Sequence, residues 1–157
     1  MAEDVIQRID RARAIVFDWA GTLWTSKIGM SNAAQNMIRH LHECSIQMAI
    51  LSNTEKPGDA EWLRRKLNEL DLLQYFEVVF SSADYGLHKP DPEAFYAVGR
   101  FFNLQPHHIY MIGDSKTCDS GSWKVGWQFV HVESDTSFQW AKIVQDKFSK
   151  EKKQFFI

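Results

Sequence analysis

Short apolar runs alternate along this chain with longer segments in which apolar residues recur every three or four positions. The short runs are rich in β-branched and aromatic residues, as expected of strands that helices cover on both faces of a sheet. Alternation of such strands with helical segments is typical of βαβ units. The sequence therefore predicts an α/β fold with a Rossmann-like, doubly wound and mainly parallel five-stranded sheet. The predicted strands are Ala14–Phe17, Met48–Leu51, Val78–Phe80, Ile109–Ile112 and Phe129–Val132.

Most of the predicted helices have a recognisable start. Ser31 is the expected cap of the first, the second follows Asp59, and Asp91 followed by Pro92 begins the third. A last helix is expected from about Ser137 to Lys150. The apolar residues expected to face the sheet are Ala34, Met37, Ile38 and Leu41, then Leu63, Leu67 and Leu70, then Phe95, Val98 and Phe102, and finally Phe138, Ile143 and Phe148.

Composition and charge narrow the classes of function. The chain has 157 residues, of which 45% are hydrophobic, so residues 1–157 are expected to form a single domain. A net charge of -2 and a pI near 6.3 do not indicate a nucleic-acid partner, since there is no broad basic field. No apolar segment approaches membrane-spanning length, so no membrane partner is expected. Only Cys44 and Cys118 are present, far apart, which predicts a reduced, cytoplasmic protein.

Residues able to do chemistry follow four of the five predicted strands. In a parallel sheet, ligands bind beyond the carboxyl ends of the strands, so these side chains are expected to converge. A hydroxyl and an amide suit the oxygens of an anion, and paired carboxylates on loops suit Mg²⁺. In chain order they are Asp18 after the first strand, Ser52 and Asn53 at the end of the second, Lys89 in the loop after the third, and Asp114 and Asp119 after the fourth.

In this order and at these strand ends, the four elements resemble the four motifs of the haloacid-dehalogenase superfamily, over about residues 12–132. The resemblance implies a cap-less hydrolase that forms an aspartyl-phosphate, with a phosphorylated small molecule or a macromolecular phosphate as substrate. The implied catalytic and phosphate-binding residues are the nucleophile Asp18, then Ser52 and Lys89, with Asn53 and Thr22 as further phosphate-binding residues. The implied ligands of the Mg²⁺ cofactor are Asp18, the backbone carbonyl of Ala20, and Asp114, with Asp119 acting directly or through water.

One position departs from the pattern of most phosphatases in this superfamily. They carry a second aspartate two residues after the nucleophile as general acid and base, and here that position is Ala20. A positioned general acid–base contributes on the order of 10²–10⁴ in rate. The substrate is therefore expected to have a good leaving group, as an acyl or aryl phosphate does. A large substrate also fits, since an absent cap leaves the site open for a partner protein or an oligomer to complete.

Two other interpretations stay open. The run Asp18-Trp19-Ala20-Gly21-Thr22 resembles the first motif of phosphonoacetaldehyde hydrolases, which cleave a carbon–phosphorus bond with the help of a lysine from a cap. Only 33 residues separate Asp18 from Ser52, and 36 separate Ser52 from Lys89, so there is no room for a cap domain. Such an enzyme would need its amine from another chain, or from Lys27 or Lys56.

The remaining interpretation is a non-catalytic or weakly active module that binds Mg²⁺ and a phosphorylated ligand. Dehalogenation, which in this superfamily also uses an aspartate without the second acid, is a further alternative. If the protein is a phosphatase, His88 is a candidate substitute for the missing proton carrier, because its unperturbed pKa of about 6.5 suits that role.

Overall fold

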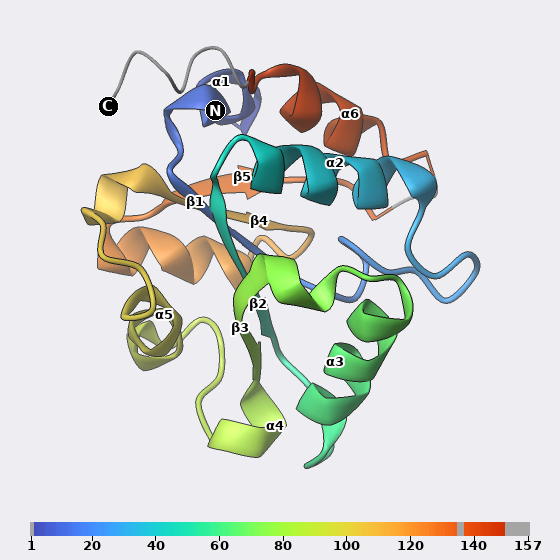
Figure 1. Cartoon of the computed structure of the whole chain (residues 1–157). Coiled ribbons are helices and arrows are strands. Elements are labelled where there is room, and N and C mark those ends of the chain that lie inside the picture. The colour runs from blue at the N-terminus through green and yellow to red at the C-terminus, as the bar shows by residue number, and fades with distance from the viewer. Residues whose placement is uncertain (1, 135–136, 150–157) are drawn as a thin grey trace.

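Five parallel strands form one sheet in the computed structural model, which describes residues 2–134 and 137–149 (Figure 1). The order of the strands across the sheet is β3-β2-β1-β4-β5, and every neighbouring pair is parallel. All five predicted strands are confirmed, and so is the Rossmann-like α/β class. The strands are β1 (Ala14–Phe17), β2 (Gln47–Ser52), β3 (Phe76–Ser81), β4 (Ile109–Gly113) and β5 (Gln128–His131).

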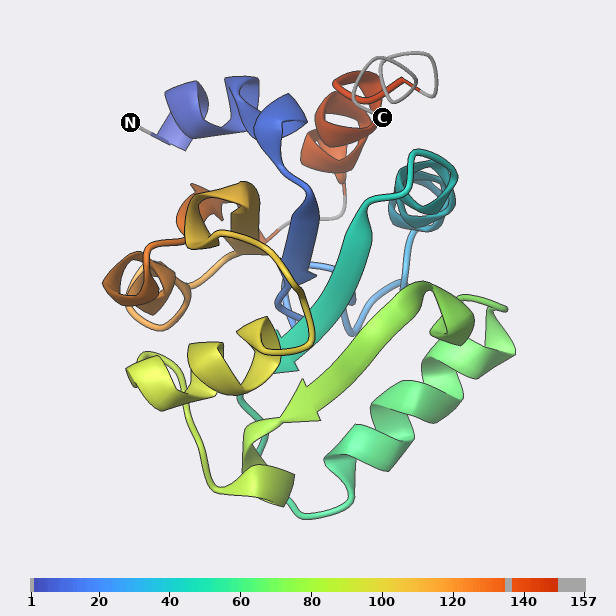
Figure 2. The same ribbon diagram turned by 60° about the vertical axis from the view of Figure 1, so that its left-hand side comes forward.

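Helices cover both faces of the sheet. Figure 2 shows α2, α3 and α6 on one side, with α5 and the 3-10 turn η4 on the other. Within β1, Ile15 and Phe17 belong to the first apolar layer, whereas Ala14 and Val16 belong to the second, as the alternation of side chains along a strand requires. The helices are α1 (Ala2–Gln7), α2 (Asn32–Glu43), α3 (Asp59–Glu69), α4 (Ser82–Tyr85), α5 (Pro92–Gly99) and α6 (Gln139–Asp146). The 3-10 turns are η1 (Ile9–Arg11), η2 (Leu73–Tyr75), η3 (Pro106–His108) and η4 (Asp119–Val125).

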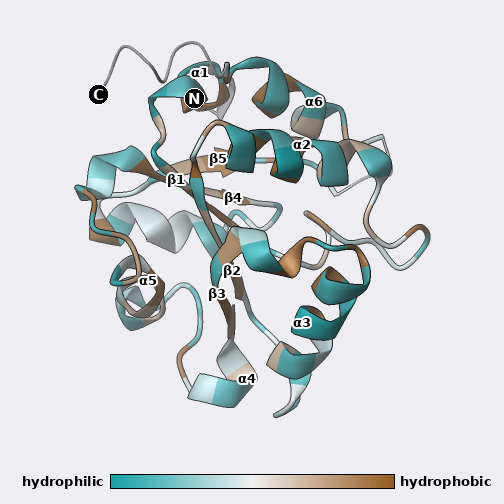
Figure 3. Ribbon diagram, viewed as in Figure 1, coloured by the Kyte–Doolittle hydropathy of each residue, from teal (hydrophilic) through white to brown (hydrophobic). Residues whose placement is uncertain are grey.

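The amphipathic pattern positions most of the helices as expected, with apolar strands between them (Figure 3). Ser31 caps α2, since its side chain accepts a hydrogen bond from the backbone N–H of Ala34 at 3.0 Å. The predicted inward residues of α2 are all buried, and so are Phe95 and Val98 of α5 and Phe102 just beyond its end. Leu70, the last of the three leucines expected to face the sheet from the second helix, is partly buried against the apolar layer that also contains the inward residues of α2.

The last helix differs from its prediction. It spans Gln139–Asp146, shorter than the expected segment from Ser137 to Lys150, and Lys150 itself lies outside the described residues. Phe138 and Phe148 are buried as predicted, but Ile143 was placed wrongly, because it is 40% exposed and Val144 faces the core instead. Within α6 the inward residues are Trp140, Ala141 and Val144, and since a helix turns about 100° per residue, Ile143 lies outside this face.

The connections after the strands are short where the chemistry is expected. The segment from Asp18 to Ser31 and the loop from Asn53 to Gly58 carry no inserted domain, which agrees with the absence of a cap in the described residues. The chain reverses its direction of winding between β1 and β4, and in open α/β sheets the ligand site lies at such a switch point. Among the described helices, none has the length and apolar character needed to cross a membrane.

Candidate active site

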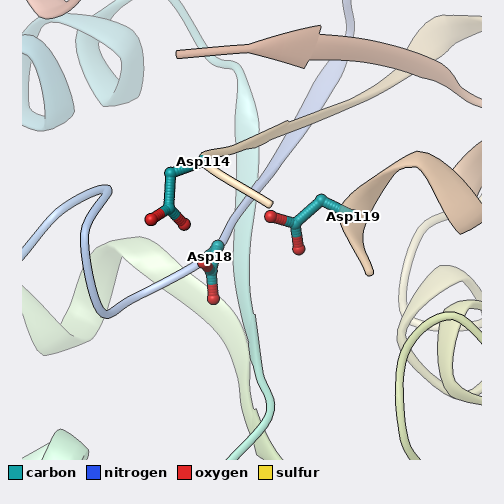
Figure 4. Close-up of side chains that lie close together, drawn as sticks. All are labelled: Asp18, Asp114 and Asp119. Atoms are coloured by element: carbon teal, nitrogen blue, oxygen red, sulfur yellow. The ribbon is translucent and has the colours of Figure 1, made fainter. Parts of the chain in front are cut away.

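Three carboxylates gather beyond the ends of the two central strands. Asp18 directly follows β1, Asp114 directly follows β4, and Asp119 begins η4. Each offers one oxygen such that all three oxygens lie within 4.8 Å of one another. Figure 4 shows the three side chains close together at this edge of the sheet. The convergence expected from the strand ends is therefore present in the structure.

Lys89 is almost completely buried between two of these carboxylates, with 4% of its surface exposed. Its Nζ donates one hydrogen bond to Asp18 Oδ1 at 3.1 Å and another to Asp119 Oδ1 at 2.5 Å. Burial alone would lower the pKa of Lys89, but the charges of Asp18 and Asp119 outweigh it and hold that pKa above its usual value. The ammonium group is therefore charged at neutral pH and offsets part of the negative charge around it.

Two glycines make room for the carboxylates. Gly113 ends β4, and a Cβ atom on it would overlap the carboxyl group of Asp119. Gly21 has a φ of +79°, and a Cβ there would overlap the carboxyl group of Asp114. Both positions thus require glycine because backbone and carboxylate come too close for any side chain, and at Gly21 the left-handed conformation adds to that requirement.

The loop that carries Lys89 is held by the side chain of Asn53. Asn53 Nδ2 donates to the backbone oxygen of Lys89, and the backbone N–H of Lys89 donates to Asn53 Oδ1, both at 2.9 Å. These two hydrogen bonds connect the loop after β2 to the loop before α5. The sequence suggested phosphate binding by the Asn53 amide, and that role stays a prediction. What the structure shows is that this amide positions the lysine.

The other predicted phosphate-binding side chains lie on either side of this cluster. Ser52 ends β2, is 3% exposed, and lines a pocket next to the cluster. Thr22 is fully buried, and its Oγ1 donates to Asp114 Oδ1 at 3.4 Å. Thr22 thus lies against a carboxylate in this structure, and its expected contact with phosphate is untested.

The pocket beside the cluster has a volume of about 420 Å³. It lies between the turn after β1 and the loop after β2, and its lining includes Ala20, Ser52, Glu55, Lys56 and Trp62. Sequence reasoning missed Glu55 and Trp62, since neither belongs to a motif and each lines the pocket only through the placement of the loop after β2 and of α3. Of the two lysines considered as amines, Lys56 lines this pocket and Lys27 does not.

A larger cavity, of about 970 Å³, opens at the opposite edge of the sheet. It is lined by residues that precede or begin the strands, such as Arg13, Gln47 and His108, and by none of the predicted site residues. The chemistry of the carboxylate cluster decides between the two, and it places the candidate active site at the carboxyl edge.

The donor set of the cluster fits a magnesium ion. Mg²⁺ takes six oxygen ligands at about 2.0–2.1 Å, so that opposite ligands are about 4.2 Å apart. The carboxylate oxygens of Asp18, Asp114 and Asp119 already lie within 4.8 Å of one another, which is close to that spacing. Both carboxylate oxygens of Asp119 already accept hydrogen bonds: Oδ1 accepts from Lys89 Nζ, and Oδ2 accepts from the backbone N–H of Ser115 at 3.0 Å.

Asp114→Asn is expected to stabilise the metal-free protein above about pH 7, by about 1 kcal/mol once solvent screening is allowed for. Burial, followed by the hydrogen bond and charge of Asp18, raises the pKa of Asp114 from 3.8 to about 6. Since the folded-state pKa lies above the unfolded value, the ionised carboxyl group destabilises the fold. That penalty grows as the pH rises from about 4 to about 6 and stays constant beyond it.

The measurement is urea unfolding of parent and variant in EDTA, at about pH 8 and about pH 4. The gain should be present at the higher pH and absent at the lower. Glu77→Gln is the matched control, because it removes an equal charge from an exposed position on β3 and should change the free energy of unfolding by less than about 0.5 kcal/mol. An Asp114→Asn variant less stable than the parent at about pH 8 would contradict the repulsion inferred here.

Comparisons with known proteins agree with this arrangement. The family model described as haloacid dehalogenase-like hydrolase matches residues 6–132. A HAD-superfamily hydrolase from Ehrlichia chaffeensis is similar in structure, with a TM-score of 0.71, 21% sequence identity, and coverage of 86% of this chain and 95% of that chain. No curated protein matches the sequence.

Two further solved structures have names that refer to phosphatases. One is the core domain of a putative phosphoglycolate phosphatase from Streptococcus pneumoniae, at 26% identity and a TM-score of 0.59, covering 80% of this chain and 84% of that chain. The other is a HAD phosphatase from Thermococcus onnurineus, at 25% identity and a TM-score of 0.58, covering 71% of this chain and 51% of that chain. With the family model spanning every strand and the whole carboxylate cluster, the chain belongs to the haloacid dehalogenase-like hydrolases.

Proposed function

We propose that the protein is a magnesium-dependent phosphohydrolase that acts through an aspartyl-phosphate on Asp18. The observation that carries this proposal is the contact of Lys89 Nζ with Asp18 Oδ1 at 3.1 Å, beside a cluster of three carboxylates at the carboxyl edge of the sheet. A carboxylate attacks a phosphate dianion only where cations reduce the repulsion between them. Lys89 supplies one such cation, and the donor set around Asp18 suits a second.

In this proposal, some residues of the site bind the metal and others bind the phosphate. Asp18 and Asp114, with the backbone carbonyl of Ala20, would hold Mg²⁺, and Asp119 would support it through water because both of its oxygens accept hydrogen bonds. The ion would supply positive charge to the phosphoryl oxygens. Ser52 and Lys89 bind the same oxygens, and the two hydrogen bonds between the Asn53 side chain and the backbone of Lys89 keep the lysine loop in place.

The reaction takes place in two displacements. A carboxylate oxygen of Asp18 forms a bond to phosphorus while the bond from phosphorus to the leaving-group oxygen breaks, and the electron pair leaves with that oxygen. Water then attacks phosphorus, the bond to Asp18 breaks, and the products are inorganic phosphate and the free carboxylate. The two steps consume only the phosphate substrate and one water molecule, and the solvent exchanges the protons.

Ala20 decides which substrates can react. In related phosphatases, this position holds the aspartate that protonates the leaving group, and here its side chain is a methyl group exposed at the pocket. A leaving group that is stable as an anion needs no such proton, so acyl and aryl phosphates are the expected substrates. The short loops around the site also leave it accessible to a phosphate on a macromolecule.

The test is a panel of acetyl phosphate, 4-nitrophenyl phosphate, phenyl phosphate and ethyl phosphate, assayed with Mg²⁺ and with EDTA. Turnover should require Mg²⁺ and should fall by at least about 10²-fold from the most acidic leaving group to the alkyl one, because protonation by a general acid is worth about that much. Ala20→Asp should raise the rate for ethyl phosphate by at least about tenfold and change the rate for acetyl phosphate little. Equal rates across the panel would contradict the role given to Ala20. Binding of Mg²⁺ with no turnover of any member would favour the non-catalytic interpretation.

One observation favours a second candidate, a phosphonatase-like enzyme. Lys56 lines the pocket that holds Ala20, and so an amine is present on this chain where the leaving group would lie. An aldehyde substrate would form a Schiff base with that amine. Reduction with borohydride in the presence of phosphonoacetaldehyde should then label the parent and not Lys56→Ala. Equal labelling of both would exclude Lys56 as the amine, and no labelling of either would exclude this candidate.

A further inference from the structure

We infer that the pocket beside Ala20 binds the leaving group of the substrate as a planar aromatic ring, with Trp62 as its main contact. This inference rests on the proposed function, because it takes Asp18 as the attacking group. It narrows the substrate class from phosphates with good leaving groups to aryl phosphates. The pocket, the tryptophans around it and the charge of its lining each support it.

The position of the pocket matches that of a leaving group. Its lining contains Trp19 and Ala20, which directly follow Asp18 in the chain, and Ser52, which lies at the end of the neighbouring strand. A phosphate held by Ser52 would therefore have the pocket next to it. The volume of about 420 Å³ is within the range of small-molecule sites and exceeds what a bare phosphate needs.

Three tryptophans pack against one another here, and two of them, Trp19 and Trp62, line the pocket. Trp19 and Trp24 stack with ring centroids 5.3 Å apart and planes at 16°. Trp62 meets both edge to face, at 6.3 Å from Trp19 and 5.6 Å from Trp24. Trp19 is buried, but Trp62 stays 37% exposed and lines the pocket, so it is the ring that a ligand can reach.

The Trp62 ring is held before any ligand arrives. Besides its two tryptophan neighbours, the Nζ of Lys66, one turn further along α3, lies 5.6 Å from its centroid. A ring fixed in this way loses little conformational freedom on binding, and aromatic pairs contribute beyond the area that they bury. An exposed, fixed tryptophan in a pocket wall is therefore well suited to a planar apolar partner.

The charge of the lining argues against a second anionic group. Lys56 is accompanied there by Glu55 and Asp59, and the Asp59 carboxyl accepts a hydrogen bond from the backbone N–H of Lys56 at 3.0 Å. Because positive and negative side chains are both present, the pocket does not attract a second phosphate group, such as that of a nucleoside diphosphate. It accepts a neutral ring instead. An aryl oxygen is also a weak base, since a phenol has a pKa of about 10, and so it leaves without the proton that Ala20 cannot give.

The test measures binding without turnover. Phenylphosphonate and methylphosphonate differ only in the ring, and neither contains a phosphate ester to hydrolyse. Calorimetric titration in Mg²⁺ should show phenylphosphonate binding at least about tenfold more tightly than methylphosphonate. Trp62→Ala should remove most of this preference and leave the affinity for methylphosphonate unchanged, while Trp62→Phe should retain it.

Trp123→Ala is the matched control, because Trp123 is 61% exposed, packs against Phe129, and does not line the pocket. Its preference for phenylphosphonate should equal that of the parent. The inference is overturned if the two phosphonates bind equally, if neither binds, or if both tryptophan-to-alanine variants lose the preference equally. If the preference depends on Trp62 but no phosphate in the panel is hydrolysed, the aromatic site stands and the proposed hydrolase activity fails. If acetyl phosphate is hydrolysed and Trp62 has no effect on ring binding, the activity stands and the aromatic site fails.

Discussion

Asp18→Asn is expected to reduce the hydrolysis of every phosphate substrate by at least about 10⁴-fold, since it removes the carboxylate proposed to attack phosphorus and to bind Mg²⁺. The fold should remain intact. An asparagine has nearly the same shape, and Lys89 keeps its contact with Asp119 at 2.5 Å. Loss of the Asp18 charge also relieves repulsion with Asp114, which offsets part of the lost ion pair. Phosphate release from 4-nitrophenyl phosphate, together with circular dichroism, measures both effects.

The control for this experiment is Asp146→Asn, which removes a carboxylate at the end of α6 whose side chain is 61% exposed. It should leave the rate of hydrolysis unchanged. Full activity of Asp18→Asn in a preparation free of other phosphatases would show that a different group attacks phosphorus. A variant that is inactive and also unfolded would be compared with Asp18→Ala and with the parent in EDTA, so that loss of structure and loss of chemistry are measured apart.

The parts of the fold that depend on local pattern were predictable from the sequence. Each strand is a short apolar run bounded by polar residues, and Ser31 is a cap whose hydrogen bond to the Ala34 N–H needs only neighbouring residues. The convergence of Asp18, Asp114 and Lys89 also followed, because parallel strands bring their carboxyl ends to one edge whatever the exact packing. This part of the candidate site is therefore predictable once the strands are known to be parallel.

Features that depend on distant contacts were not predictable. The Asn53 side chain reaches the backbone of Lys89, which lies 36 positions further along the chain. Asp84 similarly accepts hydrogen bonds from Gly58 and Ala60 at the start of α3, and these backbone contacts lower its pKa. The phase of the last helix, and with it the exposure of Ile143, depends on how that segment packs. Such features follow only when two loops or layers have been placed against each other.

The second large effect concerns stability. Lys89→Met is expected to lower the free energy of unfolding of the metal-free protein by about 3–5 kcal/mol at neutral pH. In the parent, charged Lys89 stabilises the fold at neutral pH, below its unfolded pKa of 10.5, and as the pH rises this contribution is lost through its raised folded-state pKa. Removing the ammonium group leaves Asp18 and Asp119 buried beside Asp114 with no cation. Urea unfolding in EDTA measures the loss.

The matched control is Lys142→Met, the same substitution in an exposed pair. Lys142 Nζ lies 3.1 Å from Asp146 Oδ1 on the surface of α6, so removing this ammonium group should lower the free energy of unfolding by about 0.5 kcal/mol or less. A cost for Lys89→Met as small as that for Lys142→Met would show that the buried contacts contribute little to the fold.

The dependence of this loss on pH and on metal identifies its cause. Without Lys89, the charge that favours ionisation of Asp119 is gone, so the pKa of Asp119, which burial already raises in the parent, rises further. The destabilisation is then largest above about pH 7 and shrinks as the pH falls toward about 4, where the carboxylates take up protons instead. A divalent cation would replace the missing positive charge, so Mg²⁺ should restore more stability to Lys89→Met than it adds to the parent. A loss that neither acid nor Mg²⁺ reduces would come from packing of the lysine stem, and the electrostatic account of this cluster would be wrong.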